Sequence, residues 1–385
     1  MKHPLLLALA SLSLSLHAAD PDGFVSMFNG RDLTGWTNVN CAPETWTVKD
    51  GAIHCTGKPV GALRTLRHYE NFIIEAEWRH LSSGGNSGMF MWGTPISAPG
   101  VPFLRGIEVQ VLDHGYMTQF EKANGKKSDW FTTHGDVFPI HGATMKPLGR
   151  HRGERSFPSE ERSKPSPEWN HYRVVASNGV LRLSVNGKEV SGGDDCNYRQ
   201  GYLALESEGA PVEFRNIRIK ELPSSNPDPA MIAPLDPGWM PLYNGLDLRG
   251  WKNADAAKSR WAANDWQLAL KTGADATKHT LWTDAEFGNA EFTLDVKPGK
   301  DATADTAPAI LVRGREGQGT EINLADVPSG KWTRVVITTK GGASVVQIGG
   351  KEVRRIPISS GARGVLGLRD TGAAMEFGNL HVRSL

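Results

Sequence analysis

Phe72-Ile73-Ile74-Glu75-Ala76-Glu77-Trp78-Arg79 is the stretch that decides the fold class of this chain. Apolar and charged residues alternate along it, and a period of two places them on opposite faces of a β-strand. Residues 181–185 (LRLSV) repeat this pattern and run into Asn186-Gly187, the usual dipeptide of a hairpin turn. Glycine-rich turns recur at short intervals. The sequence therefore predicts an all-β chain built from antiparallel β-sandwiches.

The same sequence features occur twice and in the same order. Residues 27–36 (MFNGRDLTGW) return as residues 242–251 (LYNGLDLRGW), and residues 106–113 (GIEVQVLD) return as residues 319–326 (GTEINLAD). We therefore expect two tandem sandwiches, at residues 22–222 and 238–385, joined by a proline-rich linker at 223–237. The second is a shorter, degenerate copy. Tryptophans that recur in both copies are expected in the cores: Trp36 with Trp251, Trp46 with Trp261, and Trp169 with Trp332.

The N-terminus and the charge balance bear on the compartment and on the partners. Residues 1–19 have a charged start, a short apolar stretch and small residues at the end, which predicts a signal peptide and a periplasmic or secreted protein. With 43 Lys+Arg against 42 Asp+Glu, nothing favours nucleic acid. No apolar run is long enough for membrane insertion. An exported chain permits a disulfide, for which Cys41 and Cys55 are the nearest pair, with Cys196 left over. Structural packing is the expected role of all three.

The two copies differ where function is expected. Copy one carries an insertion at residues 114–168, directly after the strand that holds Glu108 and Gln110. These two residues are two positions apart and share one face, which predicts a polar groove. Asn86-Ser87-Gly88 corresponds to residues 307–309 (Ala-Pro-Ala) in copy two, where every polar side chain is lost. A site used once should differ between the copies in this way.

The insertion supplies further candidates, each with a structural alternative. Trp130 either stacks on a sugar ring or anchors the loop. His134, Asp136 and His141 either bind a metal or decorate a surface loop, because their spacing is not diagnostic. Our working expectation is that no cofactor is needed, with a metal left open.

An ordered set of motifs resembles the 3-keto-disaccharide hydrolase domain family, whose fold is similar to the concanavalin A-like jelly roll of lectins and glucanases. The motifs are residues 28–36 (FNGRDLTGW), 85–88 (GNSG), 108–113 (EVQVLD), 168–170 (EWN) and 214–217 (FRNI). The resemblance is strong over residues 24–222 and weaker over 238–385. It implies exported processing of glycosides oxidised to a ketone at C3. Members often carry Arg at the end of the strand after Asn-Ser-Gly, where this chain has Trp92 and copy two has Arg313.

A C3 ketone acidifies the hydrogen on C2, so a base can remove that hydrogen and expel the C1 substituent, after which water adds. This chemistry needs a base and donors that stabilise an enolate. We expect Glu108 or His134 to be the base, with Gln110 beside it. The expected substrate-binding residues are Asn86, Ser87, Trp92, Asp113, Trp130, Asp136 and His141. The alternative is a non-catalytic carbohydrate-binding sandwich that uses Trp92 and Trp130 for stacking. A retaining glucanase is disfavoured, because Glu108 and Asp113 lie five positions apart on opposite faces of a strand.

Overall fold

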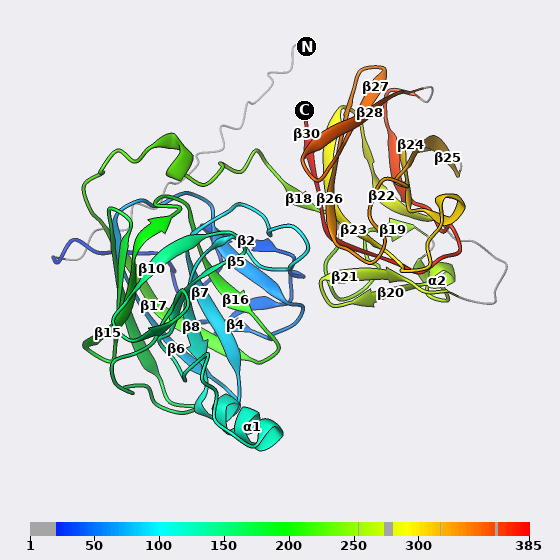
Figure 1. The fold of residues 1–385 in the computed structure, drawn as a ribbon. Helices are drawn as coiled ribbons and strands as arrows, with labels where there is room; N and C mark the ends of the chain where they lie inside the picture. Colours follow the sequence, from blue (N-terminus) through cyan, green and yellow to red (C-terminus); the bar gives the residue numbers. More distant parts are fainter. Residues whose placement is uncertain (1–20, 253, 273–279, 316, 359–360) are drawn as a thin grey trace, which may run out of the picture.

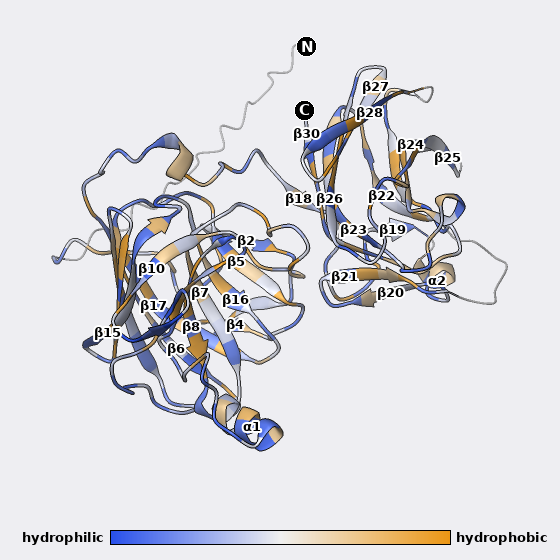
Figure 2. Cartoon of the chain, in the orientation of Figure 1, coloured by the Kyte–Doolittle hydropathy of each residue, from blue (hydrophilic) through white to orange (hydrophobic). Residues whose placement is uncertain are grey.

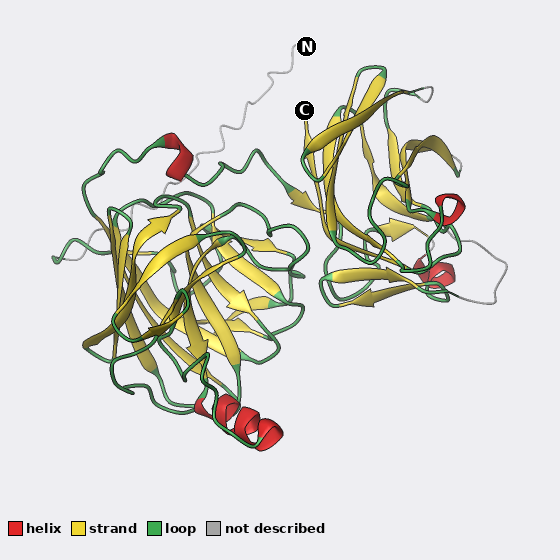
Figure 3. Ribbon diagram, in the orientation of Figure 1, coloured by secondary structure: helices red, strands yellow, loops and turns green. Residues whose placement is uncertain are grey.

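The computed structural model describes residues 21–385 except 253, 273–279, 316 and 359–360. Residues 1–19, predicted to be a signal peptide, lie outside the described residues. The regular secondary structure of the described residues is almost entirely strand, with short helices at α1 (His114–Asn124), α2 (Ala254–Ala257), η1 (Pro229–Met231) and η2 (Ala304–Thr306) (Figure 3). The predicted all-β fold of two tandem antiparallel sandwiches is confirmed (Figure 1).

Two sheets face each other in the first sandwich. One has the order β10 (Thr144–Leu148), β15 (Lys188–Asn197), β14 (Val180–Val185), β13 (Asn170–Ser177), β6 (Phe72–His80), β17 (Val212–Glu221), β4 (Ala52–Cys55), β3 (Trp46–Lys49), with β1 (Val25–Ser26) paired to β17. The other has the order β11 (His151–Arg152), β12 (Arg155–Ser156), β9 (Val137–Ile140), β8 (Gly106–Leu112), β7 (Asn86–Gly93), β16 (Tyr202–Ser207), β5 (Gly61–Thr65), β2 (Trp36–Val39).

The second sandwich is built in the same way with fewer residues. One sheet has the order β20 (Trp261–Asn264), β21 (Gln267–Leu270), β30 (Met375–Ser384), β23 (Ala290–Pro298), β26 (Thr333–Lys340), β27 (Ala343–Ile348), β28 (Lys351–Pro357), with β18 (Met240–Pro241) paired to β30. The other has the order β19 (Trp251–Lys252), β22 (Leu281–Phe287), β29 (Gly364–Leu368), β24 (Ala309–Arg315), β25 (Gln318–Asn323).

The predicted alternation is visible in the strands. On β6, Phe72, Ile74, Ala76 and Trp78 are buried in the core between the sheets. Figure 2 shows hydrophilic and hydrophobic residues interleaved along the strands. The hairpin at Asn186-Gly187 joins β14 to β15, with Val185 opposite Lys188. Burying one face of each strand is the main stabilising term of such a sandwich.

The recurring tryptophans divide into two groups. Trp36, Trp46, Trp251 and Trp261 are buried, as expected for core residues. The expectation for the third pair is wrong. The Trp169 ring lies on an outer face with the guanidinium carbon of Arg215 3.9 Å from its centroid, and half-buried Trp332 packs against Gly100. Both tryptophans recur in the sequence as core residues do. Each directly precedes a strand, β13 or β26, and at this position the ring can pack outside the core.

The insertion folds onto the first sandwich rather than away from it. Its strand β9 pairs with β8, so that Glu108 lies opposite Phe138. The strands β12 and β11 continue the same sheet beyond β9. Asp113 caps α1 by accepting a hydrogen bond from the Gly115 amide. The insertion therefore extends the sheet that carries Glu108 and Gln110.

Residues 94–105 form a loop after β7 that contacts the second sandwich. The Gly100 amide donates to Asp295 Oδ2 over 2.7 Å, and Arg334 Nη2 donates to the Ser97 carbonyl over 3.0 Å. Asn379 donates to the Val101 carbonyl over 2.9 Å. Asp295 is fully buried and also pairs with Arg334. A buried carboxylate with these partners fixes the position of the loop.

The segment 222–239 between the sandwiches lies against the first one. The Asp236 amide donates to the Tyr202 hydroxyl over 2.8 Å, and the Asp236 carboxylate pairs with Arg64. The Ala233 amide donates to the Gln200 carbonyl over 2.8 Å. Polar contacts of this kind reduce the freedom that a proline-rich connection would have in solvent.

Candidate active site

One cavity on the first sandwich gathers titratable side chains on the outer face of the sheet that contains β7, β8 and β16. Its volume is about 220 Å³. It is lined by Asn86, Phe103, Glu108, Gln110, Leu112, Tyr116, Trp130, Phe131, Phe138, His141, Arg155, Glu206 and Glu208. Side chains of the neighbouring positions Val109 and Val111 point into the core instead, as the period of two requires.

Glu108 lies in this cavity with a side chain that is almost completely buried. Burial raises its pKa to about 8, and the negative charge of Glu208 adds to the effect while Arg155 opposes it. A carboxyl group whose pKa lies near neutrality can both accept and return a proton under physiological conditions. The prediction that Glu108 and Gln110 share a polar face agrees with their place in the cavity lining.

Glu206 and Glu208 complete the acidic cluster, and the sequence analysis missed them. Leu205 pairs with Met89, which places Glu206 beside Gly88 on the central strand of the site. Burial raises the Glu206 pKa well above its usual value, and the nearby charges of Glu208 and Glu108 raise it further. Burial also raises the Glu208 pKa, to about 7. The signal was present in Leu205-Glu206-Ser207-Glu208, because acidic side chains at alternate positions of a buried strand are rare unless they are used.

A chain of amides connects Gln110 to this cluster. Gln110 Nε2 donates to Asn86 Oδ1 over 2.8 Å, and Asn86 Nδ2 donates to Glu208. Gln110 Nε2 also contacts the Ser87 carbonyl at 3.2 Å. These bonds hold the Gln110 and Glu208 side chains in fixed orientations. Asn86 thus lines the cavity, and its side chain is hydrogen-bonded to Glu208.

Arg155, from the insertion, supplies a cation to the same cavity. Its Nη1 pairs with Asp136 Oδ2 at 2.9 Å and lies 3.4 Å from Gln110 Oε1. The guanidinium carbon is 3.5 Å from the centroid of the Phe138 ring. Asp136 is fully buried, so its side chain holds Arg155 rather than touching the cavity directly.

Aromatic rings from the insertion and from the loop 94–105 surround the carboxyl groups. The Trp130 side chain is 50% exposed and packs edge-on against Phe131 at 4.6 Å between centroids. The His141 ring stacks on Phe103 at 5.7 Å with an interplanar angle of 8°. Trp130 therefore combines an anchored edge with an open face, which suits stacking against a sugar ring.

Besides Asp136, four predicted site residues do not line the cavity, so the predictions for them need correction: His134, Trp92, Ser87 and Asp113. His134 is buried in the core, with its ring 4.6 Å from that of Trp78. Burial lowers its pKa well below the usual value, and neither ring nitrogen has a partner within the described part of the chain. Its backbone has a φ of +29°, which turns the side chain to the face opposite Asp136. His134 is therefore not placed to be the base.

Trp92 is also buried in the core, where its Nε1 donates to the Glu70 carbonyl over 2.8 Å. It cannot stack on a sugar from that position, and a residue at 92 does not face the cavity. Ser87 points to the core side and donates to the Glu206 carbonyl over 2.8 Å. Asp113 accepts bonds from the Gly84, Gly115 and Ser166 amides. Burial would raise the pKa of Asp113, but the hydrogen bonds from these amides outweigh burial and lower it. Asp113 therefore orders three loops rather than lining the cavity.

The predicted metal ligands do not come together. His134 faces the core, whereas His141 lines the cavity and Asp136 is occupied by Arg155. Among the residues that the structure describes, no group of three or more His, Cys, Asp or Glu is placed to hold a metal ion. The cysteines Cys41, Cys55 and Cys196 are buried free thiols, and burial raises the pKa of each of them.

The second sandwich repeats the strand register of the site without its chemistry. Met89 pairs with Val109 and Leu205, and Ile310 pairs in the same way with Ile322 and Leu368. At the corresponding positions, Glu321 stands for Glu108 and Arg369 for Glu206, and these two form an exposed ion pair. Ala309 stands in place of Gly88. An exposed ion pair therefore stands where the first sandwich has its buried acids.

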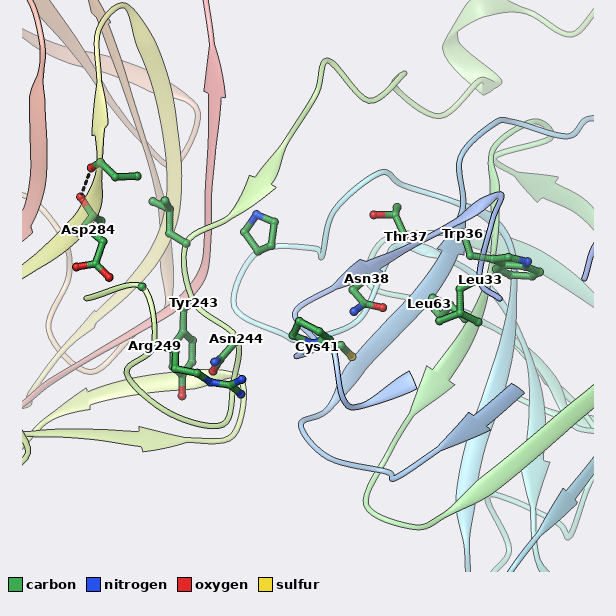
Figure 4. Close-up of a pocket in the computed structure, with 16 residues that line it drawn as sticks. Leu33, Trp36, Thr37, Asn38, Cys41, Leu63, Tyr243, Asn244, Arg249 and Asp284 are labelled. Atoms are coloured by element: carbon green, nitrogen blue, oxygen red, sulfur yellow. Dashed lines mark hydrogen bonds between the residues drawn. The ribbon is translucent and has the colours of Figure 1, made fainter. Parts of the chain in front are cut away.

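A larger cavity, of about 600 Å³, lies between the two sandwiches. Figure 4 shows Trp36, Asn38 and Leu63 on one side and Tyr243 and Arg249 on the other. Its carboxylate, Asp284, is exposed to solvent. The smaller cavity with buried acids is therefore the better candidate for chemistry.

The fold and this cavity define a β-sandwich protein with buried acid–base groups on an outer sheet face. The model of the 3-keto-alpha-glucoside-1,2-lyase-like domain matches residues 23–220, slightly more than half of the chain. The chain belongs to this domain family, and its resemblance to 3-keto-disaccharide hydrolases is confirmed.

The chain is also similar to individual proteins and solved structures. A 3-keto-disaccharide hydrolase of Bacteroides thetaiotaomicron is 23% identical over 256 residues, covering 53% of this chain and 80% of that protein. A provisionally assigned glycosyl hydrolase from Parabacteroides distasonis is 22% identical with a TM-score of 0.38, covering 52% of this chain and 95% of its own. The β-glucanase of Bacillus licheniformis is 12% identical with a TM-score of 0.34, covering 52% of this chain and 97% of its own.

Proposed function

We propose that this chain cleaves the glycosidic bond of 3-keto-glycosides by base-promoted elimination followed by addition of water, with Glu108 as the base. The observation that carries the proposal is a buried glutamate in a cavity, with a pKa raised to about 8, on the strand that the family motif includes. The relative named as a 3-keto-disaccharide hydrolase supports the substrate class.

The chemistry follows from the ketone. Glu108, as a carboxylate, takes the hydrogen from C2, and the electron pair moves toward the C3 oxygen to give an enolate. Arg155 is the charged donor of the cavity and is held in place by Asp136, so it is our choice to stabilise the enolate oxygen. The enolate then expels the C1 substituent, and water adds to C1. Trp130 and His141 would hold the sugar ring against the carboxyl groups.

The experiment that tests this function offers the purified protein a 3-keto-disaccharide and the matching unoxidised disaccharide. We expect release of a 3-keto-monosaccharide from the first substrate and none from the second. The alternative, a non-catalytic carbohydrate-binding sandwich, predicts binding of the unoxidised sugar and no turnover of either. Turnover of the unoxidised sugar would instead indicate ordinary glycoside hydrolysis by paired carboxyl groups.

We also propose that the second sandwich is a degenerate duplicate that does not catalyse this reaction. The shared strand register supports the duplication, and Arg369 at the position of Glu206 removes the acid cluster. Substitution of Glu321 by Gln should leave turnover unchanged. This variant therefore serves as the matched control for every substitution of Glu108.

Export to the periplasm or the medium is a further part of the proposal, on the basis of residues 1–19. Expression of the full chain in a bacterial host, followed by fractionation and mass determination of the mature N-terminus, tests it. A processed chain that begins at or near Asp20 is the expected result, and an intact chain retained in the cytoplasm would contradict it.

A further inference from the structure

Glu206 and Glu208 are close enough for their side chains to share a hydrogen bond. Carboxyl groups have no hydrogen to share when both are ionised, so such a contact requires at least one proton on the pair. Burial raises the pKa of both groups, and the hydrogen bond between them adds to the increase at Glu206 and partly offsets it at Glu208. The proton is therefore held on the Glu206 side of the pair.

The free oxygen of Glu206 faces the site. Only 2% of the residue is exposed, and its Oε2 has no hydrogen-bond partner among the described residues. Glu208 is different, because Asn86 donates to it and fixes its orientation. A buried, unpartnered oxygen costs free energy unless a ligand supplies a partner. Glu206 Oε2 is thus the position where the bound substrate is expected to complete a hydrogen bond.

Glu206 Oε2 and Glu108 Oε1 converge above Gly88. They lie 3.0 and 2.8 Å from the point that a Cβ of residue 88 would occupy. Two carboxyl groups this close can act on neighbouring atoms of one sugar ring. In the proposed reaction these atoms are the hydrogen on C2 and the oxygen on C1.

We propose that the Glu206–Glu208 pair is the general acid that protonates the leaving-group oxygen through Glu206 Oε2, a role that rests on the proposed elimination. Glu108 removes the C2 hydrogen, and the enolate electrons then form the C1–C2 double bond as the C1–O bond breaks. The bound leaving-group oxygen takes the proton of the pair at Glu206 Oε2 and leaves as an alcohol. Both carboxyl groups are then negatively charged, and their repulsion favours the return of a proton in the next step.

The same groups complete the hydration. The deprotonated pair takes a proton from water while the water oxygen bonds to C1, and Glu108 returns its proton to C2. The pair and Glu108 are then back in their starting states. The net change is one water consumed, with one alcohol and one 3-keto sugar formed, and no oxidant or metal is needed for the balance.

Glu206→Gln tests the acid with substrates that differ only in the leaving group. A methyl 3-keto-glucoside needs protonation of a poor leaving group, whereas the 4-nitrophenyl analogue does not. Each substrate is tested as its α-anomer and its β-anomer, and the rate of its spontaneous breakdown without protein is subtracted. We expect the variant to lose about 10²- to 10⁴-fold in kcat on the methyl substrate, and less than about tenfold on the 4-nitrophenyl substrate.

Several outcomes would overturn the proposal in different places. Equal losses on both substrates would remove the acid role while leaving the elimination intact. No turnover of either substrate by the wild type would instead reject the proposed function itself. Glu321→Gln is the matched control and should behave as wild type on both substrates.

Glu208→Gln provides an independent reading in case Glu206→Gln folds poorly. The amide cannot carry the negative charge that keeps the proton on Glu206, so the alkaline limb of the pH profile on the methyl substrate should move to lower pH. An unmoved alkaline limb would contradict the pairing. The 4-nitrophenyl substrate should show no such limb in the wild type.

Discussion

Glu108 and Glu206 approach each other above Gly88, with their oxygens 2.8 and 3.0 Å from the place where a side chain would begin. The glycine leaves the space that brings both acids into one cavity. Gly88→Ala should therefore push the two carboxyl groups apart. We expect a loss of at least about tenfold in kcat, since misplacement of catalytic groups by 1 Å can cost about 10²-fold.

The control for this substitution is in the other sandwich, where Ala309 occupies the corresponding position. Ala309→Gly should leave turnover unchanged. Circular dichroism would verify that both variants are folded. A Gly88→Ala protein with wild-type kcat would show that the approach of the two acids is not needed.

The acids should make the protein less stable as the pH rises. The folded-state pKa of Glu108 is raised from 4.5 to about 8, and that of Glu208 to about 7. The folded protein therefore binds more protons than the unfolded chain across this interval, and the free energy of unfolding falls from about pH 4.5 to about pH 8.

Glu108→Gln removes one of these groups and keeps its size. At pH 8 it should increase the free energy of unfolding by at least about 1 kcal/mol, and at pH 4 the difference from wild type should be small. Urea unfolding at the two pH values measures this. The same gain at both pH values would mean that ionisation of Glu108 is not the cause.

His134 should be dispensable for catalysis. It lies in the core beside Trp78, away from the cavity, and its ring nitrogens have no partner within the described residues. His134→Phe should keep kcat and KM within about threefold, and stability should change by no more than about 1.5 kcal/mol, as for a size-conserving core substitution. Steady-state kinetics on a 3-keto-disaccharide would check this, and a loss above about a hundredfold would restore His134 as a catalytic residue.

The second sandwich should support the site through the loop 94–105. Asp295 accepts from Gly100 and Arg334, and the same loop brings Phe103 to the cavity wall. Asp295→Asn should destabilise the protein by about 3–5 kcal/mol, as expected when one member of a buried ion pair is removed. The wall should loosen, so KM should rise more than kcat falls.

Glu291→Gln is the matched control for this position. Glu291 pairs with Arg383 at 2.9 Å on the same sheet, and its hydrogen-bond partners, Thr338 and Arg383, lie outside the loop 94–105. The KM of the Glu291→Gln variant should equal that of the wild type. If both variants changed KM alike, the effect would be a general one of stability and not one of the loop.

The sequence predicted what depends on strand periodicity. Residues 72–79 form the strand β6, and Glu108 and Gln110 share an outer face, because a period of two determines which way each side chain points. The same reasoning applied to Leu205-Glu206-Ser207-Glu208 would have found the other two acids.

Trp92 and His134 were not predictable in this way. Their φ values of +57° and +29° reverse the alternation at an irregular point of the chain, and spacing in the sequence does not reveal such a point. In both cases the side chain enters the core instead of the cavity.

The role of Glu108 is tested most directly by the rate at which Glu108→Gln and Glu321→Gln convert a 3-keto-disaccharide, measured beside the wild type across pH 5 to 9. Wild-type activity should rise toward about pH 8 as Glu108 loses its proton. Glu108→Gln should be slower by at least about 10²-fold, and Glu321→Gln should equal the wild type. Equal turnover by Glu108→Gln and the wild type would show that Glu108 is not the base.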